Sequence, residues 1–332
     1  MAIEVDLIGV GSPVVDLLAH VKEDFLAEVA GDKGGMELVD AAVLTELTEK
    51  LEGAPKQAAG GSAGNTAFAA GKLGTKVGFL GKLGNCAAAQ FYQDRFAEIG
   101  SDLSRFKKGE VPNAKCLSLV TPDSERTMRT DLGAAMTLAP EEVSEEDFKG
   151  AKHVHMEGYL LFNRDLMKKV LESAKAAGCT TSLDMASFEV VKASEEVLSK
   201  WLKDYVDIVF ANEDEAAAYF PDLGKDYKAM AAAFGEICEV AAVKLGKDGS
   251  LIARGGEVEF VEPIVIEQAI DTTGAGDYWA GGFLYGWLQG KPLATCGRYG
   301  SIMGAEVVQV LGASLSEEKW QELVGNLDRY VG

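Results

Sequence analysis

Short apolar runs alternate with amphipathic segments along most of the chain, and this alternation restricts the possible folds more than any other property of the sequence. The apolar runs have the length of β-strands and occupy residues 6–11, 76–81, 153–157, 181–185, 206–212 and 240–246. Helical spacing of apolar residues marks the segments 64–74, 87–100 and 164–178. Strands that alternate with helices in this way are typical of a parallel sheet. We therefore expect an α/β fold with a mostly parallel central sheet and helices on both of its faces.

Two segments interrupt the alternation. Residues 14–53 begin with an alternating strand and end with a short helix near 41–52, and residues 113–132 have the pattern of a hairpin that turns at 121–124. We expect these two segments to form together a small antiparallel β lid over one edge of the main domain. The remaining residues, 1–13, 54–112 and 133–332, then form one large α/β domain.

Charge and composition argue against several classes of partner. The 332 residues carry a formal net charge of −20, and 47% of them are hydrophobic, which is enough for a substantial core. A nucleic-acid surface needs the opposite charge, so we expect no nucleic-acid partner. The sequence has no basic amphipathic segment and no uninterrupted apolar run of about 20 residues, so we expect no membrane association. The five cysteines are scattered and odd in number, which suits reduced thiols in a cytoplasmic protein.

A glycine-containing turn with the sequence DTTGAGD, residues 271–277, precedes a helical pattern that begins at Tyr278. Gly274 and Gly276 allow the main-chain N–H groups of the turn to approach a ligand closely. Because a helix N-terminus presents unpaired N–H groups and the positive end of the helix dipole, this turn is a candidate anion site. Asp277 lies beside it, either as a functional carboxylate or as an acid that only stabilises the start of the helix.

Three further segments carry polar residues at positions where ligands collect. Residues 60–66, with the sequence GGSAGNT, precede a helix of small residues and suit either phosphate binding or close packing of that helix. Asn212 ends an apolar strand, and Glu215 follows at the spacing of a capping box. The carboxyl end of a parallel strand is also where ligands bind in open α/β sheets. Asp16 lies where the chain enters the lid segment, and none of these signals is specific when taken alone.

Taken together, these motifs resemble those of the ribokinase/adenosine kinase family, the PfkB-type carbohydrate kinases, with the bacterial adenosine kinase-like members the most similar. Residues 271–277 resemble the family's C-terminal signature, residues 60–74 its N-terminal signature and residues 212–215 its N-x-x-E element. The three motifs occur in the family's order, and the resemblance covers nearly the whole chain. It implies a ribokinase-like fold in which the large domain binds the nucleotide and carries catalysis.

The resemblance also implies a role for each motif, with ATP and Mg²⁺ as cofactors. Asp277 corresponds to the base that accepts the proton of the attacking hydroxyl, and Gly274, Ala275 and Gly276 correspond to the anion hole for the transferred phosphoryl group. The other residues that it places in the site are Asn212 and Glu215 for Mg²⁺, with Glu215 acting through water; Asp16, Gly60, Gly61, Asn65 and Glu157 for the sugar hydroxyls; Lys244, Gly246, Gly249 and Thr272 for the nucleotide; and Asp271 and Thr273 for a monovalent cation such as K⁺, with carbonyls from the segment near Gly312.

One segment departs from the family pattern. Residues 81–90 carry Asn85, Cys86 and Ala89 where many members have acidic residues and a glycine. The phosphate-site motifs are intact, so we expect activity to be retained, and only the local contacts near the sugar are left open.

The family does not fix the acceptor. A long insert between Asp16 and Gly60, the apolar Val14 and residues 125–135 resemble adenosine kinase-like members, and an apolar wall suits a flat base. Glu157, at a strand end, instead favours a sugar hydroxyl. We expect ATP-dependent phosphorylation of a primary hydroxyl on a ribose-type ring, with adenosine or another purine nucleoside first and a free sugar such as ribose, fructose or 2-keto-3-deoxygluconate second. A non-catalytic binding protein on the same fold is a third hypothesis, and the sequence does not distinguish a monomer from a homodimer.

Overall fold

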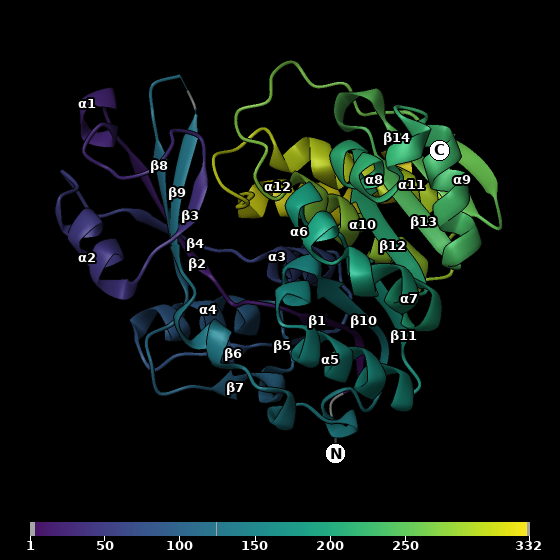
Figure 1. Ribbon diagram of the computed structural model, residues 1–332. Coiled ribbons are helices and arrows are strands. Elements are labelled where there is room, and N and C mark those ends of the chain that lie inside the picture. Colours follow the sequence, from purple (N-terminus) through teal and green to yellow (C-terminus); the bar gives the residue numbers. More distant parts are fainter. Residues whose placement is uncertain (1–3, 124, 331–332) are drawn as a thin grey trace.

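Eight strands form the central sheet of the structure, a computed structural model that describes residues 4–123 and 125–330 (Figure 1). In the order in which they lie side by side, these strands are β15 (Glu257–Val261), β14 (Ser250–Arg254), β13 (Val240–Lys244), β12 (Ile208–Asn212), β11 (Thr180–Asp184), β10 (Ala151–Glu157), β1 (Val5–Val10) and β5 (Val77–Leu80). The strands from β13 to β5 are parallel, whereas β14 and β15 are antiparallel additions at one edge. The predicted α/β class with a mostly parallel sheet is confirmed.

Helices cover both faces of the sheet because each strand alternates its side chains between them. One face carries α3 (Ser62–Lys72), α10 (Ala275–Leu288) and α11 (Leu293–Val307), and the other carries α5 (Arg164–Ala176), α7 (Glu195–Tyr205), α8 (Glu213–Tyr219) and α9 (Tyr227–Ile237). In β12, Ile208 and Phe210 pack into the core with α3 and α10, whereas Val209 and Ala211 pack into the core with α5 and α9. Continuous apolar runs such as residues 208–211 therefore mark strands buried on both faces.

The remaining helices, short strands and 3₁₀ turns lie outside the central sheet and outside the five-stranded sheet described next. They are α1 (Glu23–Leu26), α2 (Ala41–Glu49), α4 (Ala87–Glu98), α6 (Phe188–Ala193), α12 (Glu317–Asn326), the paired strands β6 (Lys82–Leu83) and β7 (Lys107–Lys108), and the 3₁₀ turns Leu103–Arg105, Gly133–Thr137, Pro140–Glu142, Glu145–Asp147, Gly158–Phe162, Pro221–Leu223, Gly246–Asp248 and Leu327–Tyr330. Among the helices of the described residues, none combines the length and the apolar character that a membrane span requires.

A second sheet stands beside the central one, on the left of Figure 1, and is called the lid sheet below. Its strands, in order, are β3 (Met36–Leu38), β9 (Arg126–Asp131), β8 (Lys115–Val120), β2 (Val15–His20) and β4 (Lys56–Ala59). The pairs β8–β9 and β2–β4 are antiparallel, as expected for a lid, and β2–β8 and β3–β9 add parallel pairing. β2 and β8 run in the same direction because both leave the large domain at one place, where the Val15 N–H donates to the Ala114 carbonyl at 3.0 Å.

The chain returns from the lid sheet to the large domain later than the sequence analysis expected. β4 pairs with β2 up to Ala59, so a lid that ends at residue 53 leaves this strand out. The short segment KQAA has no alternation of apolar and polar residues, and only Ala58 is buried. Its place in the sheet depends on the partner strand β2 and could not be derived from its own residues.

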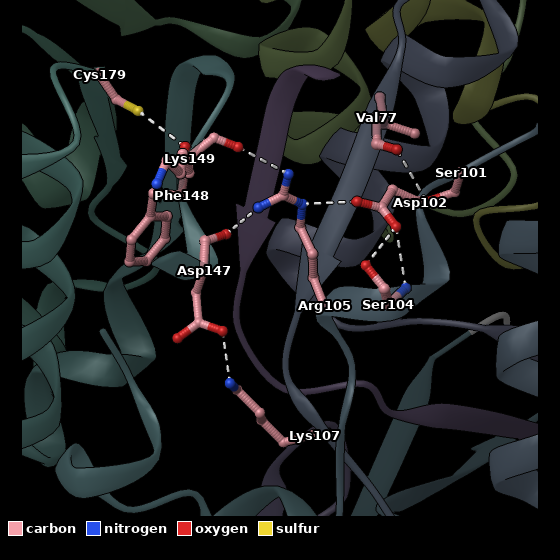
Figure 2. Close-up of polar contacts among 10 residues, drawn as sticks. All are labelled: Val77, Ser101, Asp102, Ser104, Arg105, Lys107, Asp147, Phe148, Lys149 and Cys179. Atoms are coloured by element: carbon pink, nitrogen blue, oxygen red, sulfur yellow. Dashed lines mark hydrogen bonds and ion pairs between the residues drawn. The ribbon is translucent and has the colours of Figure 1, made fainter. Parts of the chain in front are cut away.

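The buried side chain of Arg105 ties the segment before β7 to the segment before β10 (Figure 2). The Arg105 Nε donates to the Asp102 carboxylate at 3.0 Å, and these side chains are 7% and 5% exposed. The other guanidinium nitrogens donate to the main-chain carbonyls of Asp147 and Lys149. Lys107 adds an ion pair to the Asp147 carboxylate. One guanidinium therefore cross-links two segments that lie some forty residues apart in the sequence.

Candidate active site

Four neighbouring strands of the central sheet end in polar residues. β10 ends at Glu157, β11 at Asp184, β12 at Asn212 and β13 at Lys244. Because these strands are parallel, their carboxyl ends lie along one edge of the sheet, where ligands bind in open α/β folds. The start of α10 lies at the same edge, since a Cβ on Gly276 would be 3.1 Å from the Lys244 Nζ. The predicted motifs at the strand ends and at the start of α10 are thus brought together.

Asp277 lies in the first turn of α10 and is held by side chains of α3. The Ser62 Oγ donates to its Oδ1 at 2.7 Å, and the Asn65 Nδ2 donates to its Oδ2 at 2.9 Å. Burial raises the pKa of Asp277 to about 6, the hydrogen bond from Asn65 opposes this rise, and the charge of Asp184 adds to it. A carboxylate that is ionised at neutral pH but has a raised pKa is suited to accept a proton.

The turn in front of α10 presents main-chain N–H groups. Gly274 has a φ of 73°, a left-handed conformation that favours glycine, and it lets the chain turn sharply into the helix. The Ala275 N–H donates to the Thr272 carbonyl at 3.1 Å, whereas the N–H groups of Gly274 and Gly276 have no partner among the described residues. Two of the three predicted anion-hole donors are therefore free to bind an oxyanion.

Lys244 and three carboxylates form a charged centre at the ends of β11 to β13. The Lys244 Nζ donates to Asp184 at 2.7 Å. Burial would raise the pKa of Asp184, but the charge and hydrogen bond of Lys244, together with the Ala186 N–H and the charge of His155, hold that pKa below its usual value. Glu215 shows the opposite balance, because burial and then the charge of Asp184 raise its pKa to about 7. Asp277 also lies within electrostatic range of Lys244. The single ammonium of Lys244 therefore compensates only part of the negative charge of Asp184, Glu215 and Asp277.

Asn212 and Glu215 form the predicted capping box at the start of α8. The Asn212 N–H and Nδ2 each donate to the Glu215 carboxylate at 2.8 Å, and the Glu215 N–H donates to the Asn212 Oδ1 at 2.9 Å. These bonds fix the Glu215 carboxylate within electrostatic range of Asp184. Oxygen donors in a centre with excess negative charge fit Mg²⁺, a hard cation that leans on few carboxylates and keeps several waters.

Asp16, on β2, faces the loop that contains Gly60 and Gly61. A Cβ on Gly60 would lie 2.4 Å from the Asp16 Oδ2, and one on Gly61, where φ is +82°, would lie 2.2 Å from a main-chain carbonyl. Burial raises the pKa of Asp16 to about 7, Arg126 opposes the rise and the charge of Asp277 adds to it. No hydrogen-bond donor from the described residues contacts the Asp16 carboxylate. This carboxylate is therefore available to accept hydrogen bonds from the hydroxyls of a ligand.

The Glu157 carboxylate accepts hydrogen bonds from the main chain of two segments, the loop after β1 and the start of α3. Its Oε1 accepts the Ser12 N–H at 2.9 Å and its Oε2 accepts the Ala63 N–H at 3.1 Å, while the residue is only 2% exposed. Burial raises its pKa to about 7, although these two hydrogen bonds oppose the rise. The arrangement favours a role in which Glu157 positions the start of α3, rather than the predicted direct contact with a sugar hydroxyl.

Four residues at the site were not predicted from the sequence. Ser62, Asp184, Arg126 and Tyr159 all interact with the predicted residues. Tyr159 is 42% exposed, and burial followed by the charges of Glu157 and Asp277 raises its pKa to about 12. Asp184 was recognisable in principle, because it ends an apolar strand as Asn212 does, and Ser62 lies inside the motif GGSAGNT. Arg126 lies in the segment 125–135 that resembles adenosine kinase-like members, but nothing local indicated its contact with Asp271, since that contact depends on how the lid sheet meets the large domain.

Asp271, predicted with Thr273 to hold a monovalent cation, is surrounded by hydrogen-bond donors. Its Oδ1 accepts the Thr273 N–H at 2.9 Å, and its Oδ2 accepts the Gly312 N–H at 2.7 Å. The Arg126 Nη1 lies 3.2 Å from each of the two oxygens. The segment near Gly312, from which carbonyls for the cation were expected, thus directs an N–H at this carboxylate. Such a set of donors does not fit a free cation, which binds oxygen ligands.

The remaining predicted residues lie around this centre. Gly246 and Gly249 are in the turn after β13, where the Leu245 N–H donates to the Gly249 carbonyl at 2.8 Å, and Thr272 is exposed in the turn before α10. Cys86 is the N-cap of α4 and its Sγ accepts the Asn113 N–H at 3.3 Å. In the same departing segment, Asn85 donates to the Glu110 carbonyl and Ala89 is buried, so these three residues are used in local packing.

Comparisons with known proteins agree with this geometry. The family model described as "pfkB family carbohydrate kinase" matches residues 35–320. The adenosine kinase of Saccharomyces cerevisiae is 27% identical over 335 residues, which cover 94% of this chain and 97% of its own. The ATP-dependent ribose-1-phosphate kinase of Halopiger xanaduensis is 29% identical over 251 residues, covering 75% of this chain and 80% of its own. Among solved structures, the adenosine kinase from Sinorhizobium meliloti is 30% identical, with a TM-score of 0.86 and coverage of 99% of this chain and 100% of its own.

Proposed function

The chain belongs to the pfkB family of carbohydrate kinases, and from this membership we propose that it transfers the γ-phosphoryl group of ATP to a primary hydroxyl of a ribose-containing small molecule. The protein is a kinase of the PfkB type that acts on a sugar or a nucleoside. The proposed acceptor is adenosine or another purine nucleoside, and the proposed cofactors are ATP and Mg²⁺.

The observation that carries the proposal is the position of Asp277 between a phosphate site and a hydroxyl site. The free N–H groups of Gly274 and Gly276 lie on the same helix start as the carboxylate. On the other side, the Asp16 carboxylate accepts no hydrogen bond from the residues that the structure describes, and it lies within electrostatic range of Asp277. An anion-binding turn, a proton acceptor and a hydroxyl-binding carboxylate within electrostatic range of one another are the parts that transfer to an alcohol requires.

In the proposed reaction, Asp277 orients the acceptor hydroxyl and takes its proton as the new bond to phosphorus forms. Ser62 and Asn65 hold the carboxylate in place, so its direction is set before the substrates bind. The Gly274 and Gly276 N–H groups stabilise the negative charge on the transferred group. Lys244 lies close enough to Gly276 to add a full positive charge at the same place.

Asp184, Asn212 and Glu215 would hold Mg²⁺ that arrives with ATP. Bound there, the metal ion would neutralise phosphate charge and orient the phosphates for displacement. Before ATP binds, Lys244 satisfies Asp184, and Asn212 satisfies Glu215. The carboxylates are thereby kept in position without a metal ion.

The surroundings of Asp16 support a nucleoside acceptor. Val14, Ala114 and Cys116 form a small buried apolar cluster at the base of the lid sheet, with Met128 and Ala135 packed against it. Tyr159 is partly exposed, and it lies near enough to Asp277 for the charge of that carboxylate to raise the pKa of the Tyr159 hydroxyl. An apolar wall and an accessible aromatic face suit a flat purine base, which gains from stacking. A free sugar needs more hydrogen-bond donors and acceptors than this wall provides.

A sugar acceptor is the second candidate, supported by the similarity to a relative named as a ribose-1-phosphate kinase. In both cases we place the enzyme in the cytoplasm, because its five cysteines are all free thiols.

A coupled ATP-consumption assay with a panel of acceptors tests the proposal. The panel comprises adenosine, inosine, guanosine, cytidine, ribose, fructose and 2-keto-3-deoxygluconate, each with Mg²⁺. We expect one purine nucleoside to exceed every sugar in kcat/KM by at least about tenfold. We also expect Tyr159→Leu to raise KM for that nucleoside and to leave KM for the sugars unchanged.

Three other outcomes would each point elsewhere. A sugar with the highest kcat/KM would establish the second candidate. ATP consumption that ignores every acceptor would favour a binding protein on this fold. Equal effects of Tyr159→Leu on nucleosides and sugars would contradict the stacking role of Tyr159.

A further inference from the structure

The carboxylate of Asp271 joins three parts of the chain that are far apart in the sequence. It precedes the anion-binding turn, it accepts the Gly312 N–H from the loop after α11, and it contacts Arg126 at the start of β9. The side chains of Arg126 and Asp271 are 10% and 4% exposed. The contact is therefore a nearly buried ion pair between the lid sheet and the large domain.

The position of this ion pair matters because Asp271 also orders the turn that binds the phosphoryl group. Its Oδ1 holds the Thr273 N–H, and the next residue is Gly274, whose Cβ position lies 2.7 Å from the Ala313 Cβ. The turn is thus clamped between Asp271 and the loop at residues 312–313. Any change in the group that compensates Asp271 will act on the free N–H groups of Gly274 and Gly276.

Asp271 needs a positive partner because its carboxylate is charged in the folded protein. Burial would raise the pKa of Asp271, but the hydrogen bonds from Gly312 and Thr273, together with the Arg126 charge, hold that pKa below its usual value. A buried charge without a counter-charge is costly. Among the described residues, Arg126 is the cationic group that contacts this carboxylate.

We propose that Arg126 is a permanent side-chain cation at Asp271, in place of a free monovalent cation, so that this kinase requires no K⁺. The proposal rests on the proposed phosphoryl transfer, because it assigns Arg126 as a positioning residue for the anion-binding turn. The guanidinium is fixed to the lid sheet by the Arg126 Nη2, which donates to the Ser118 Oγ at 2.6 Å. The lid sheet thereby supplies the charge that orders the turn.

The same guanidinium influences the acceptor end of the site. Its charge lowers the pKa of Asp16, and its Nε is buried without a partner among the described residues. Removing Arg126 therefore leaves two carboxylates, Asp16 and Asp271, without their shared counter-charge. The vacated position at Asp271 then becomes available to a small cation from solution.

The test compares K⁺ with tetramethylammonium at equal ionic strength, in the wild type, Arg126→Met, Arg126→Lys and the control Lys56→Met. Lys56 is an exposed cation on β4 of the same sheet. We expect the wild type and Lys56→Met to have the same kcat and the same Tm in both salts. We expect Arg126→Met to lose about tenfold in kcat in tetramethylammonium and to recover most of it in K⁺, with a higher Tm in K⁺. Arg126→Lys should keep the higher rate in both salts.

The Tm arm needs no turnover, so it decides the proposal even if the acceptor panel identifies no substrate. A wild type whose rate and Tm both rise with K⁺ would overturn the proposal, because Asp271 would then accept a free cation despite Arg126. An Arg126→Met variant that folds and ignores K⁺ in both measurements would also overturn it. If only the nucleoside proposal fails, the Tm of Arg126→Met should still be higher in K⁺ than in tetramethylammonium, and the Tm of the wild type should still be the same in both salts.

Discussion

At the scale of single residues, the site is organised by how each carboxylate is compensated. Asp277 is held by two neutral donors, Ser62 and Asn65, so it keeps its basicity. Asp184 is paired with an ammonium and is less basic as a result. Asp16 has no hydrogen-bond donor in the described part of the chain and is left to accept one from a ligand. Three acids of the same type thus acquire three different roles from their neighbours.

The compensation of Asp277 predicts the pH dependence of activity. Asp277 must be ionised to accept a proton, and its pKa of about 6 lies above the ordinary value, so the inactive protonated form accumulates as the pH falls. We expect kcat/KM to decline as the pH is lowered from about 7 through about 6. Asp16 and Glu215 each have a pKa of about 7 and titrate in the same pH range. The decline of kcat/KM at low pH therefore reflects the titration of all three carboxylates together.

Ser62→Ala isolates the contribution of Asp277 to this limb. The hydrogen bond from Ser62 lowers the pKa of Asp277, so its loss raises that pKa and moves the acidic limb to higher pH. Profiles of kcat/KM for wild type and Ser62→Ala between about pH 5 and pH 8 provide the measurement. Superimposable limbs in the two proteins would mean that a different group controls the profile.

At the scale of elements, the site depends on the close approach of α3 and α10. A Cβ on Gly281 of α10 would lie 2.8 Å from both the Thr66 carbonyl and the Ala69 Cβ of α3. Small residues at this contact bring Asn65 within reach of Asp277. This explains why the two family motifs, more than 200 residues apart, operate as one unit. The sequence analysis recognised each motif because each is local, but the contact between the helices required the structure.

The ion pair in Figure 2 gives a stability prediction at the same scale. Arg105→Met removes the cation from the buried Asp102 and the donors from two main-chain carbonyls. We expect the free energy of unfolding to fall by about 3–5 kcal/mol, because an uncompensated charge is left in the interior. Equilibrium unfolding in urea measures the change.

Arg164→Met is the matched control for Arg105→Met. Arg164 pairs with Glu196 at 2.8 Å, but these side chains are 44% and 77% exposed. An exposed pair contributes less than about 1 kcal/mol, so this variant should unfold nearly as the wild type does. Equal losses in the two variants would show that burial is not the source of the effect at Arg105.

At the scale of the whole molecule, the sequence predicts the layered large domain well because parallel strands are buried on both faces. Runs such as residues 208–211 and 240–243 are apolar for that reason, and the polar residues that end these strands, Asn212 and Lys244, mark the active edge. Pairing between strands that are far apart in the sequence was harder to predict. The parallel pairing of β2 with β8 and the place of β4 depend on where the chain leaves and re-enters the large domain. The pair Arg126–Asp271 could not be derived, because it arises only where two sheets meet.

The central claim is that Asp277 is the base for phosphoryl transfer to a hydroxyl, and the most direct measurement is the turnover of Asp277→Asn beside its affinity for ATP. Asparagine keeps the size of the side chain and removes its basicity, so we expect kcat to fall by roughly 10² to 10⁴ with an almost unchanged Kd for ATP by calorimetry. Asp204→Asn, at an exposed position on α7, should retain wild-type turnover. Near-normal turnover of Asp277→Asn would contradict the account, because the proton would then have another acceptor.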